Sequence, residues 1–223
     1  MMNLKQLAKE LNLSISAVSK ALRDSHEISE VTKRIVWAKA KELNYQVNPF
    51  ASSLRKQKSK TIAVIIPEVV NDFFGPVING IESIAQEKGY HVLIYLTHED
   101  IQKEVSITNL LQNGRVDGIL ISISAQTNDT AHLEALKEKE IPLVFFDRVV
   151  DTLSVPKVIT DDYASGYKAT QHLIERGCKR ISYLTMSQSL SISRKRMNGY
   201  LEALKNNNIP VDNSLIITLT ENT

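Results

Sequence analysis

The chain has 223 residues, a hydrophobic content of 43% and a formal net charge of +2, so it is long enough to bury sizeable apolar cores. Its one cysteine, Cys178, excludes a fold held by internal disulfides. No apolar run reaches the ~18 residues of a membrane span, and the N-terminus lacks the apolar region of a signal peptide. These features predict a soluble, cytoplasmic protein.

The charge is distributed unevenly along the chain. Residues 1–60 contain 12 Lys and Arg against 5 Asp and Glu, whereas the remainder contains 15 against 20. A cationic N-terminal region releases condensed counterions when it meets a polyanion, which supplies sequence-independent affinity for DNA. An ordinary solvated basic face would have the same balance, so the charge alone leaves both interpretations open.

Residues 1–47 show the periodicity of three short helices. Residues 4–11 repeat apolar side chains at helical spacing, and Ser14 is placed to cap a second helix by accepting from its free amides. The residues expected to face inward from this second helix are Val18, Ala21 and Leu22. A third helix is expected between Ser29 and Asn44. Its predicted buried residues are Val31, Ile35 and Ala38.

The outer face of the second helix is expected to carry Ile15, Ser16, Ser19, Lys20 and Arg23. In a helix-turn-helix unit, the first turn of the second helix enters the major groove of DNA. There an isoleucine can meet a thymine methyl, a serine can bond to a base edge or a phosphate, and a lysine can reach the acceptors of guanine. An ordinary three-helix bundle with a polar surface is the alternative.

A short helical segment is predicted within residues 48–60. Asn48 is a suitable N-cap and Pro49 a suitable first helical residue, yet only about two turns follow before a lysine-rich run. Helices this short are marginal in water because nucleation is costly, so the segment is expected to order on a partner. Leu54 then suits a wedge between base steps. A flexible linker with an incidental leucine is the alternative.

From Thr61 onward, short apolar runs alternate with amphipathic helices, which predicts parallel sheets covered on both faces. Residues 61–160 are assigned to a first lobe and 161–223 to part of a second. Strands are predicted at 61–67, 91–96, 118–123, 143–146, 158–160, 181–185 and 214–218. Helices are predicted at 101–112, 129–139, 164–176 and 194–207. One further helix, closed by Gly89, is expected to bury Val77, Ile78, Ile81, Ile84 and Ala85.

Ligands of open parallel sheets bind beyond the carboxyl ends of the strands. Polar and aromatic residues stand at these ends, at 71–74, 97–98, 122–124, 147–148, 161–162 and 187–193. Carboxylates and an arginine bonding to hydroxyls, with an aromatic face against the ring, suit a small hydroxyl-rich ligand. Phe73 and Phe74 could equally be core residues. Asp147 and Arg148 could equally pair with each other or with neighbours.

No catalytic or metal-binding motif accompanies these residues. The sequence has no phosphate-binding loop, His-Glu-x-x-His, Cys-x-x-Cys or Gly-x-Ser-x-Gly, and its five histidines lack metal spacing. No cofactor is expected, and nothing pairs the carboxylates with a nucleophile. The sequence therefore favours a protein that is not an enzyme.

Three sequence motifs closely resemble the lactose-repressor (LacI/GalR) family of bacterial transcription regulators. They are Ala8-x-x-Leu11-x-Leu13-Ser14-x-x-x-Val18-Ser19-x-x-Leu22, then Lys41-Glu42-Leu43-Asn44-Tyr45-x-x-Asn48, and Ala51-x-x-Leu54. The resemblance implies an all-α helix-turn-helix head, a hinge helix, and an α/β periplasmic-binding-protein-like (type I) effector domain with parallel sheets. Family chains normally continue further, so the second lobe is expected to be incomplete, as in a fragment or truncated product.

The resemblance also implies two sets of site residues. In the family the second helix reads the major groove, and paired hinge helices each insert a leucine into the minor groove. The DNA-binding residues carried over are Ser14, Ile15, Ser16, Ser19, Lys20, Asn48, Ala51 and Leu54. The effector-binding residues carried over are Phe73, Asp147, Arg148 and Arg196, and more weakly Asp72, Phe74 and Asp161.

The function implied is that of a sequence-specific regulator, most simply a repressor, controlled by a small effector such as a sugar. It is expected to act as a homodimer on a pseudo-palindromic DNA operator, in the cytoplasm on the nucleoid, with no metal and no membrane. Two alternatives are a periplasmic-type small-molecule-binding protein without a regulatory role and a sugar-processing α/β enzyme.

Overall fold

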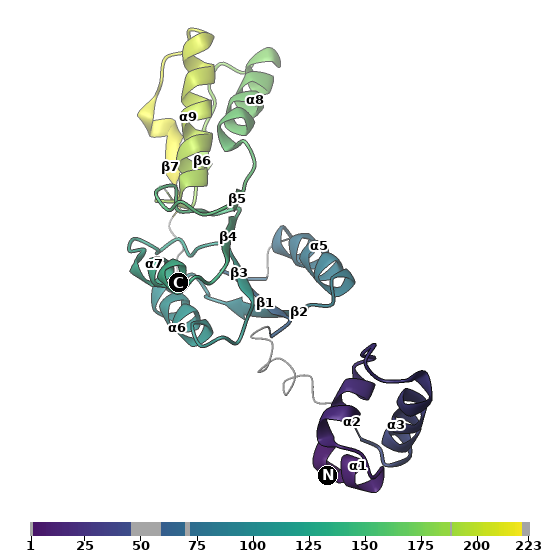
Figure 1. Cartoon of the computed structure of the whole chain (residues 1–223). Helices are drawn as coiled ribbons and strands as arrows, with labels where there is room; N and C mark the ends of the chain where they lie inside the picture. The colour runs from purple at the N-terminus through teal and green to yellow at the C-terminus, as the bar shows by residue number, and fades with distance from the viewer. Residues whose placement is uncertain (1, 46–58, 70–71, 188, 220–223) are drawn as a thin grey trace. The chain divides into compact units, whose positions relative to one another are not determined.

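The structure is a computed structural model that describes residues 2–45, 59–69, 72–187 and 189–219 (Figure 1). The chain divides into two compact units, Met1–Lys56 and Gln57–Thr223. Within the described ranges, no helix combines the length and the apolar character needed to cross a lipid bilayer.

The first unit contains the helices α1 (Leu4–Glu10), α2 (Ile15–Leu22) and α3 (Glu30–Glu42). Each begins at a side chain that accepts from a free backbone amide of the first turn: Asn3, Ser14 and Ser29. The caps at Ser14 and Ser29 confirm the predicted helix starts. The three helices enclose one apolar core, formed by Leu7, Ala8, Val18, Ala21, Leu22, Val36 and Ala40.

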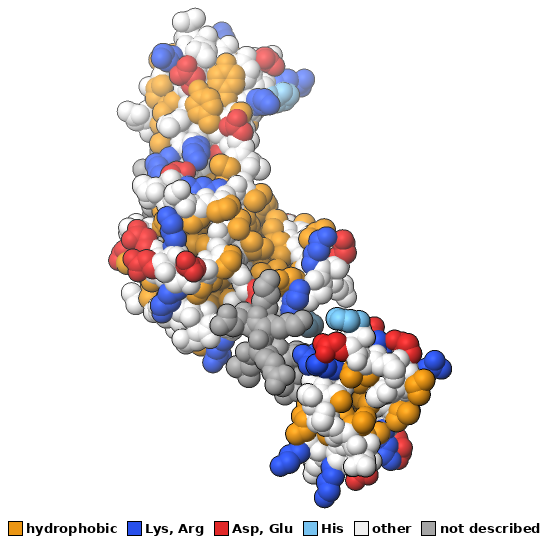
Figure 2. All heavy atoms as spheres, in the orientation of Figure 1, with side chains coloured by type: hydrophobic (Ala, Val, Ile, Leu, Met, Phe, Trp, Pro, Cys, Tyr) orange, Lys and Arg blue, Asp and Glu red, His pale blue; other side chains and the backbone are white. Residues whose placement is uncertain are grey.

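Helix α3 turns a different face to this core than the periodicity predicted. Val31 is 64% exposed, Ile35 is 54% exposed and Ala38 is also exposed. The buried positions are instead Lys33, Val36 and Ala40. The prediction was wrong because α3 carries apolar residues on two faces, so two helical phases fit the same sequence. Exposed hydrophobic side chains accordingly lie among charged ones on the surface of this unit (Figure 2).

The second unit begins with a parallel sheet of five strands in the order β2-β1-β3-β4-β5. The strands are β1 (Thr61–Ile66), β2 (His91–Leu96), β3 (Gly118–Ile121), β4 (Leu143–Phe146) and β5 (Lys157–Val158). The connecting helices are α5 (Phe74–Glu87), α6 (Ile101–Leu111) and α7 (Ala131–Glu138). Figure 1 shows α6 and α7 on one face of the sheet and α5 on the other.

Both faces of this sheet are apolar, as its continuous hydrophobic strands predict. In β1, Ala63 and Ile65 belong to the core on the α6 and α7 side, whereas Val64 and Ile66 belong to the core with Phe74 of α5. The alternation follows from the two-residue period of a strand. Successive apolar residues of one strand therefore serve two different cores.

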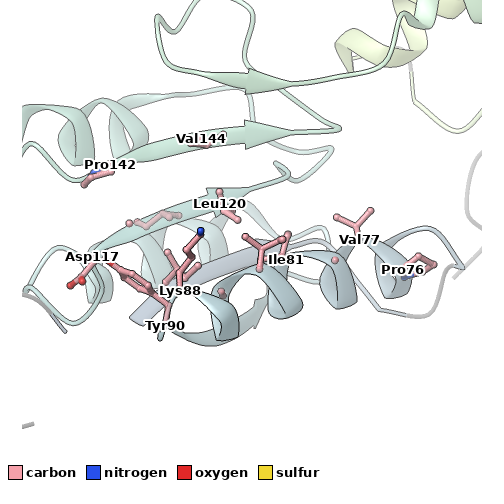
Figure 3. Close-up of a pocket in the computed structure, with 15 residues that line it drawn as sticks. Pro76, Val77, Ile81, Lys88, Tyr90, Asp117, Leu120, Pro142 and Val144 are labelled. Atoms are coloured by element: carbon pink, nitrogen blue, oxygen red, sulfur yellow. The ribbon is translucent and has the colours of Figure 1, made fainter. Parts of the chain in front are cut away.

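An apolar hollow of about 690 Å³ lies beside α5, over strands β3 and β4. Figure 3 shows Val77 and Ile81 of α5 facing the strands that carry Leu120 and Val144. Ile84 also lines this hollow and is 58% exposed. The prediction that Ile84 is buried was therefore wrong, because the residue faces this hollow and not a filled core.

The part of the chain predicted to be the second lobe contains α8 (Asp162–Glu175) and α9 (Ser191–Asn206) side by side (Figure 1). A second, parallel sheet pairs β6 (Tyr183–Thr185) with β7 (Ile216–Thr218). The short 3-10 helix η1 (Asn213–Leu215) comes directly before β7. Its apolar cluster consists of Ile181, Tyr200 and Leu204. Every predicted strand and helix of the second unit is present, with α9 beginning three residues earlier than predicted.

Candidate functional site

The first turn of α2 presents Ile15 and Ser16 to solvent. Ser14 Oγ accepts from the Ala17 N–H at 3.1 Å and lies 3.2 Å from Ser16 Oγ. Two hydroxyls and one apolar side chain are thus held together at the helix start. This is the set of groups that can contact base edges, phosphates and thymine methyls.

Further along α2, Ser19 and Lys20 already have partners within the first unit. Arg23 donates from Nε to the Ser19 carbonyl at 2.9 Å and from Nη2 to Ser19 Oγ at 3.0 Å. Lys20 forms an ion pair with Glu27, and the hydrogen bond from Lys20 lowers the pKa of Glu27. Sequence reasoning missed Glu27, because it lies seven positions after Lys20 and beyond the end of α2, where helical spacing does not predict a contact.

The remaining DNA-binding residues of the prediction are Asn48, Ala51 and Leu54. They lie outside the described residues.

In the second unit, a hollow of about 610 Å³ lies at the carboxyl ends of the first-lobe strands and reaches α9 of the second lobe. Its lining brings together five of the seven predicted effector residues: Phe73, Phe74, Asp147, Arg148 and Arg196. Aliphatic side chains of both lobes complete it, among them Val77, Val144 and Ile192. The chain therefore gathers residues that are more than 120 positions apart into one hollow, as the strand-end rule predicts.

Asp72 and Asp161 are outside the lining of this hollow. Asp72 is exposed, while Asp161 caps α8 by accepting from the Ala164 N–H at 2.9 Å. A capping carboxylate satisfies backbone donors at a helix start, so the structure gives Asp161 a local role in α8. Its neighbour Asp162 is buried and faces Arg196 instead.

The two phenylalanines differ in their burial. Phe74 is buried and meets Phe146 edge to face at 6.3 Å, so it belongs to the core under the hollow. Phe73 is 49% exposed and lies edge to face against Phe74 at 5.2 Å. Of the two rings, that of Phe73 is therefore the one exposed at the hollow.

Arg148 pairs with Glu99 and not with Asp147. Its Nη1 lies 2.6 Å from Glu99 Oε1, and Glu99 Oε2 accepts from the Ala125 N–H at 2.7 Å. Asp147 instead accepts a long hydrogen bond of 3.4 Å from the buried Ser122 hydroxyl. Glu99 follows β2 in a turn, and no sequence pattern ties it to Arg148, so sequence reasoning missed it.

Arg196 is held in the same manner. Its Nε and Nη2 both lie 2.8 Å from Asp162 Oδ1. Thr160 also donates to this oxygen, at 3.4 Å. The two guanidinium groups of the hollow are therefore each engaged by a carboxylate.

Burial raises the pKa of Asp147, and the nearby Asp162 acts in the same direction. Arg148, Arg196 and the hydrogen bond from Ser122 act in the opposite direction and only partly counteract this rise. Asp147 also has a backbone φ of +56°, a left-handed conformation that Asp and Asn adopt more readily than most residues. Asparagine is therefore a suitable neutral replacement.

Asp147→Asn is expected to raise the melting temperature at neutral pH. A raised folded-state pKa means that the native protein binds a proton more tightly than the unfolded chain, so stability is lost as the pH rises through that pKa. The gain should disappear as the pH falls below the ordinary value of 3.8, where both states are protonated. Thermal unfolding of both proteins across this range measures the effect. A gain of equal size at every pH would contradict it.

A second group of polar residues lies buried where α6, α7 and the segment after β3 meet. Glu104 is fully buried and accepts from the Ser124 N–H at 2.7 Å, while His132 Nε2 lies 2.9 Å from its other oxygen. These contacts hold the segment that follows β3, including Ala125, against the first lobe. In the ranges that the structure describes, no three His, Cys, Asp or Glu residues are grouped so as to hold a metal ion.

Residues 59–223 match the family model described as periplasmic binding proteins and sugar binding domain of LacI family. The HTH-type transcriptional regulator DegA of Bacillus subtilis (strain 168) is 30% identical over 212 residues, which are 95% of this chain and 63% of that protein. A transcriptional regulator CelR–cellobiose complex has a TM-score of 0.64 at 25% identity, over 99% of this chain and 66% of that chain.

The lac repressor dimer bound to operator and the anti-inducer ONPF has a TM-score of 0.81 over 98% of this chain and 64% of that chain. At 22% identity this likeness shows the fold, which confirms the predicted periplasmic-binding-protein-like α/β architecture with parallel strands. The chain spans only about two thirds of the length of these relatives. The match over residues 59–223, together with relatives that are named transcriptional regulators, establishes that the chain belongs to the LacI/GalR family.

Proposed function

We propose that this chain contains the operator-reading and effector-sensing parts of a transcriptional repressor. The observation that carries the proposal is the exposed first turn of α2, where Ser14, Ile15 and Ser16 are fixed together on a separate compact unit. The second unit of the chain has a ligand-sized hollow at the ends of its strands. One part is suited to read DNA and the other to respond to a small molecule.

The arrangement of the first unit supports a helix-turn-helix head. A tight turn with Asn12 at φ +52° separates α1 from α2. Residues 2–45 carry eight Lys and Arg against five Asp and Glu, so the unit attracts phosphates as a whole. With α2 in the major groove, Ile15 and Ser16 would read base edges, and Ser14 and Ser19 would contact the backbone or base edges.

Control by the effector follows from the position of the hollow between elements of both lobes. Ligand contacts to Asp147 and Arg148 of the first lobe and to Arg196 of α9 would favour one arrangement of the lobes. In a homodimer on a pseudo-palindromic operator, that arrangement would decide whether hinge segments carrying Asn48, Ala51 and Leu54 order on the minor groove. The protein would then act in the cytoplasm, on the nucleoid.

A sugar is the effector class that the hollow suits best. Phe73 supplies a half-exposed ring, and Asp147, Arg148 and Arg196 supply acceptors and donors for hydroxyls. The similar CelR structure is a complex with cellobiose, which supports a sugar here.

Selection from a library of random DNA duplexes tests the regulatory proposal. The protein should enrich a pseudo-palindromic sequence, and its affinity should fall linearly on a log–log plot against salt concentration. Ser16→Ala should weaken binding to the enriched duplex more than to unselected duplexes. A library that shows no enrichment after selection would refute sequence-specific binding.

Glu27→Gln is expected to strengthen binding to unselected duplexes by about threefold to tenfold, because Lys20 is released and one negative charge is removed next to α2. The slope of log affinity against log salt should steepen by about one unit if Lys20 then contacts a phosphate. Glu42→Gln is the matched control, since it frees Lys39 on α3 in the same way. Equal gains from both variants would indicate a general charge effect, with no contact from Lys20.

A further inference from the structure

We infer that the effector is an uncharged polyhydroxyl compound, an unphosphorylated sugar, and not a sugar phosphate or another anion. This inference rests on the proposed function, in that it takes the hollow lined by Asp147, Arg148 and Arg196 as the effector site. It concerns the charge of the ligand, which decides between two large classes of metabolites.

The cations that line the hollow are Arg148 and Arg196. Each is bound to a carboxylate that lies outside the lining: Arg148 to Glu99 at 2.6 Å, and Arg196 to Asp162 at 2.8 Å. Two guanidinium charges are therefore balanced by two carboxylates. Asp147, the third charged residue of the lining, adds a carboxylate and no positive charge.

The two carboxylates are themselves fixed in place. Glu99 uses its second oxygen to accept from the Ala125 N–H at 2.7 Å, and Asp162 is buried in the first turn of α8. A phosphate that displaced either carboxylate would leave a partly or wholly buried charge without its partner, which is costly. A phosphate that did not displace them would meet a hollow whose lining, among the residues that the structure describes, has no net positive charge once these carboxylates are counted.

A neutral sugar meets no such obstacle. A guanidinium has five N–H donors, and Arg148 uses one of its terminal nitrogens on Glu99, so donors remain for ligand hydroxyls. The Asp147 carboxyl can accept from a hydroxyl, or donate to one when it is protonated. Phe73 adds an apolar ring on which the C–H face of a sugar can lie. The described residues of the lining can therefore form hydrogen bonds to the hydroxyls of a sugar, whereas they have no unpaired positive charge to neutralise a phosphate.

Calorimetric titration at constant ionic strength tests this inference with inorganic phosphate and with three matched pairs. The pairs are glucose with glucose 6-phosphate, fructose with fructose 1-phosphate, and ribose with ribose 5-phosphate. We expect no saturable binding of phosphate, and tighter binding of the neutral member in any pair that binds. Saturable phosphate binding that is lost in Arg148→Gln or Arg196→Gln, or tighter binding of a phosphorylated member, would overturn the inference.

Two variants make the phosphate titration decisive even if none of the sugars binds. Glu99→Gln leaves Arg148 without its counter-charge and should improve phosphate affinity about tenfold or more. The double variant Glu99→Gln/Arg148→Gln should lose that gain. Glu138→Gln, at an exposed position of α7, is the matched control and should bind phosphate no better than wild type.

Asp162→Asn applies the same test to Arg196 if Glu99→Gln does not fold. A folded variant of either kind that gains no affinity for phosphate would overturn the inference, because the carboxylates would then not set the charge of the hollow. Failure of the regulatory proposal would appear elsewhere, as the lack of an enriched duplex. The two failures are therefore distinguishable.

Discussion

Glu104→Ala is expected to lower the free energy of unfolding of the first lobe by about 3–5 kcal/mol. The carboxylate is fully buried and accepts from the Ser124 N–H at 2.7 Å and from the Thr127 hydroxyl at 2.9 Å. His132 Nε2 lies 2.9 Å from it. Alanine removes all three contacts and opens a cavity. Buried polar groups without partners are then left behind, which costs more than the lost bonds alone.

Urea denaturation followed by circular dichroism measures this loss. Glu104→Gln is the matched control, because glutamine has nearly the same volume and can still accept from Ser124 with its carbonyl oxygen. Its cost should be about 1 kcal/mol, the usual contribution of one hydrogen bond. Equal losses in both variants would show that the negative charge, and not the set of hydrogen bonds, is what stabilises the segment after β3.

Gly166→Ala or Gly199→Ala is expected to destabilise the contact between α8 and α9 by about 3 kcal/mol. A Cβ at Gly166 would lie 2.1 Å from the carbonyl oxygen of Arg196, and a Cβ at Gly199 would lie 2.1 Å from that of Tyr163. The obstacles are backbone atoms of the facing helix, which no rotation of a side chain can move. The helices would have to separate, and Arg196 would shift relative to Asp162.

Denaturation midpoints test this expectation together with sugar binding, which should weaken because Arg196 lines the hollow. Gly80→Ala in α5 is the control, since no atom lies within 4 Å of the added methyl group. That variant should be more stable by about 0.5–1 kcal/mol, because alanine loses less backbone entropy in a helix than glycine. A Gly166→Ala protein as stable as wild type would contradict the close packing of α8 on α9.

Much of the fold was predictable because its determinants are local. Ser14 and Ser29 start helices through bonds to amides three residues away, and the apolar runs of β2 and β4 give strands with the predicted bounds. The failures at Val31, Ile35 and Ile84 have another origin. Val31 and Ile35 lie on α3, which carries apolar residues on two faces, so only packing decides which face is buried. Ile84 lies on the same face of α5 as Val77 and Ile81, but this face meets a hollow at Ile84.

The sequence by itself determined the order of the elements, the strand ends at which the proposed ligand-binding residues lie, and the family resemblance that the comparison then confirmed. The tertiary structure decided which charges meet. Glu99 and Arg148 are 49 residues apart, and Asp162 and Arg196 are 34 apart. Local sequence patterns do not predict such ion pairs, because the pairs depend on how strands and helices are placed in space. For the same reason, the structure, and not the sequence, separated Asp162, which holds an arginine, from Asp161, which caps a helix.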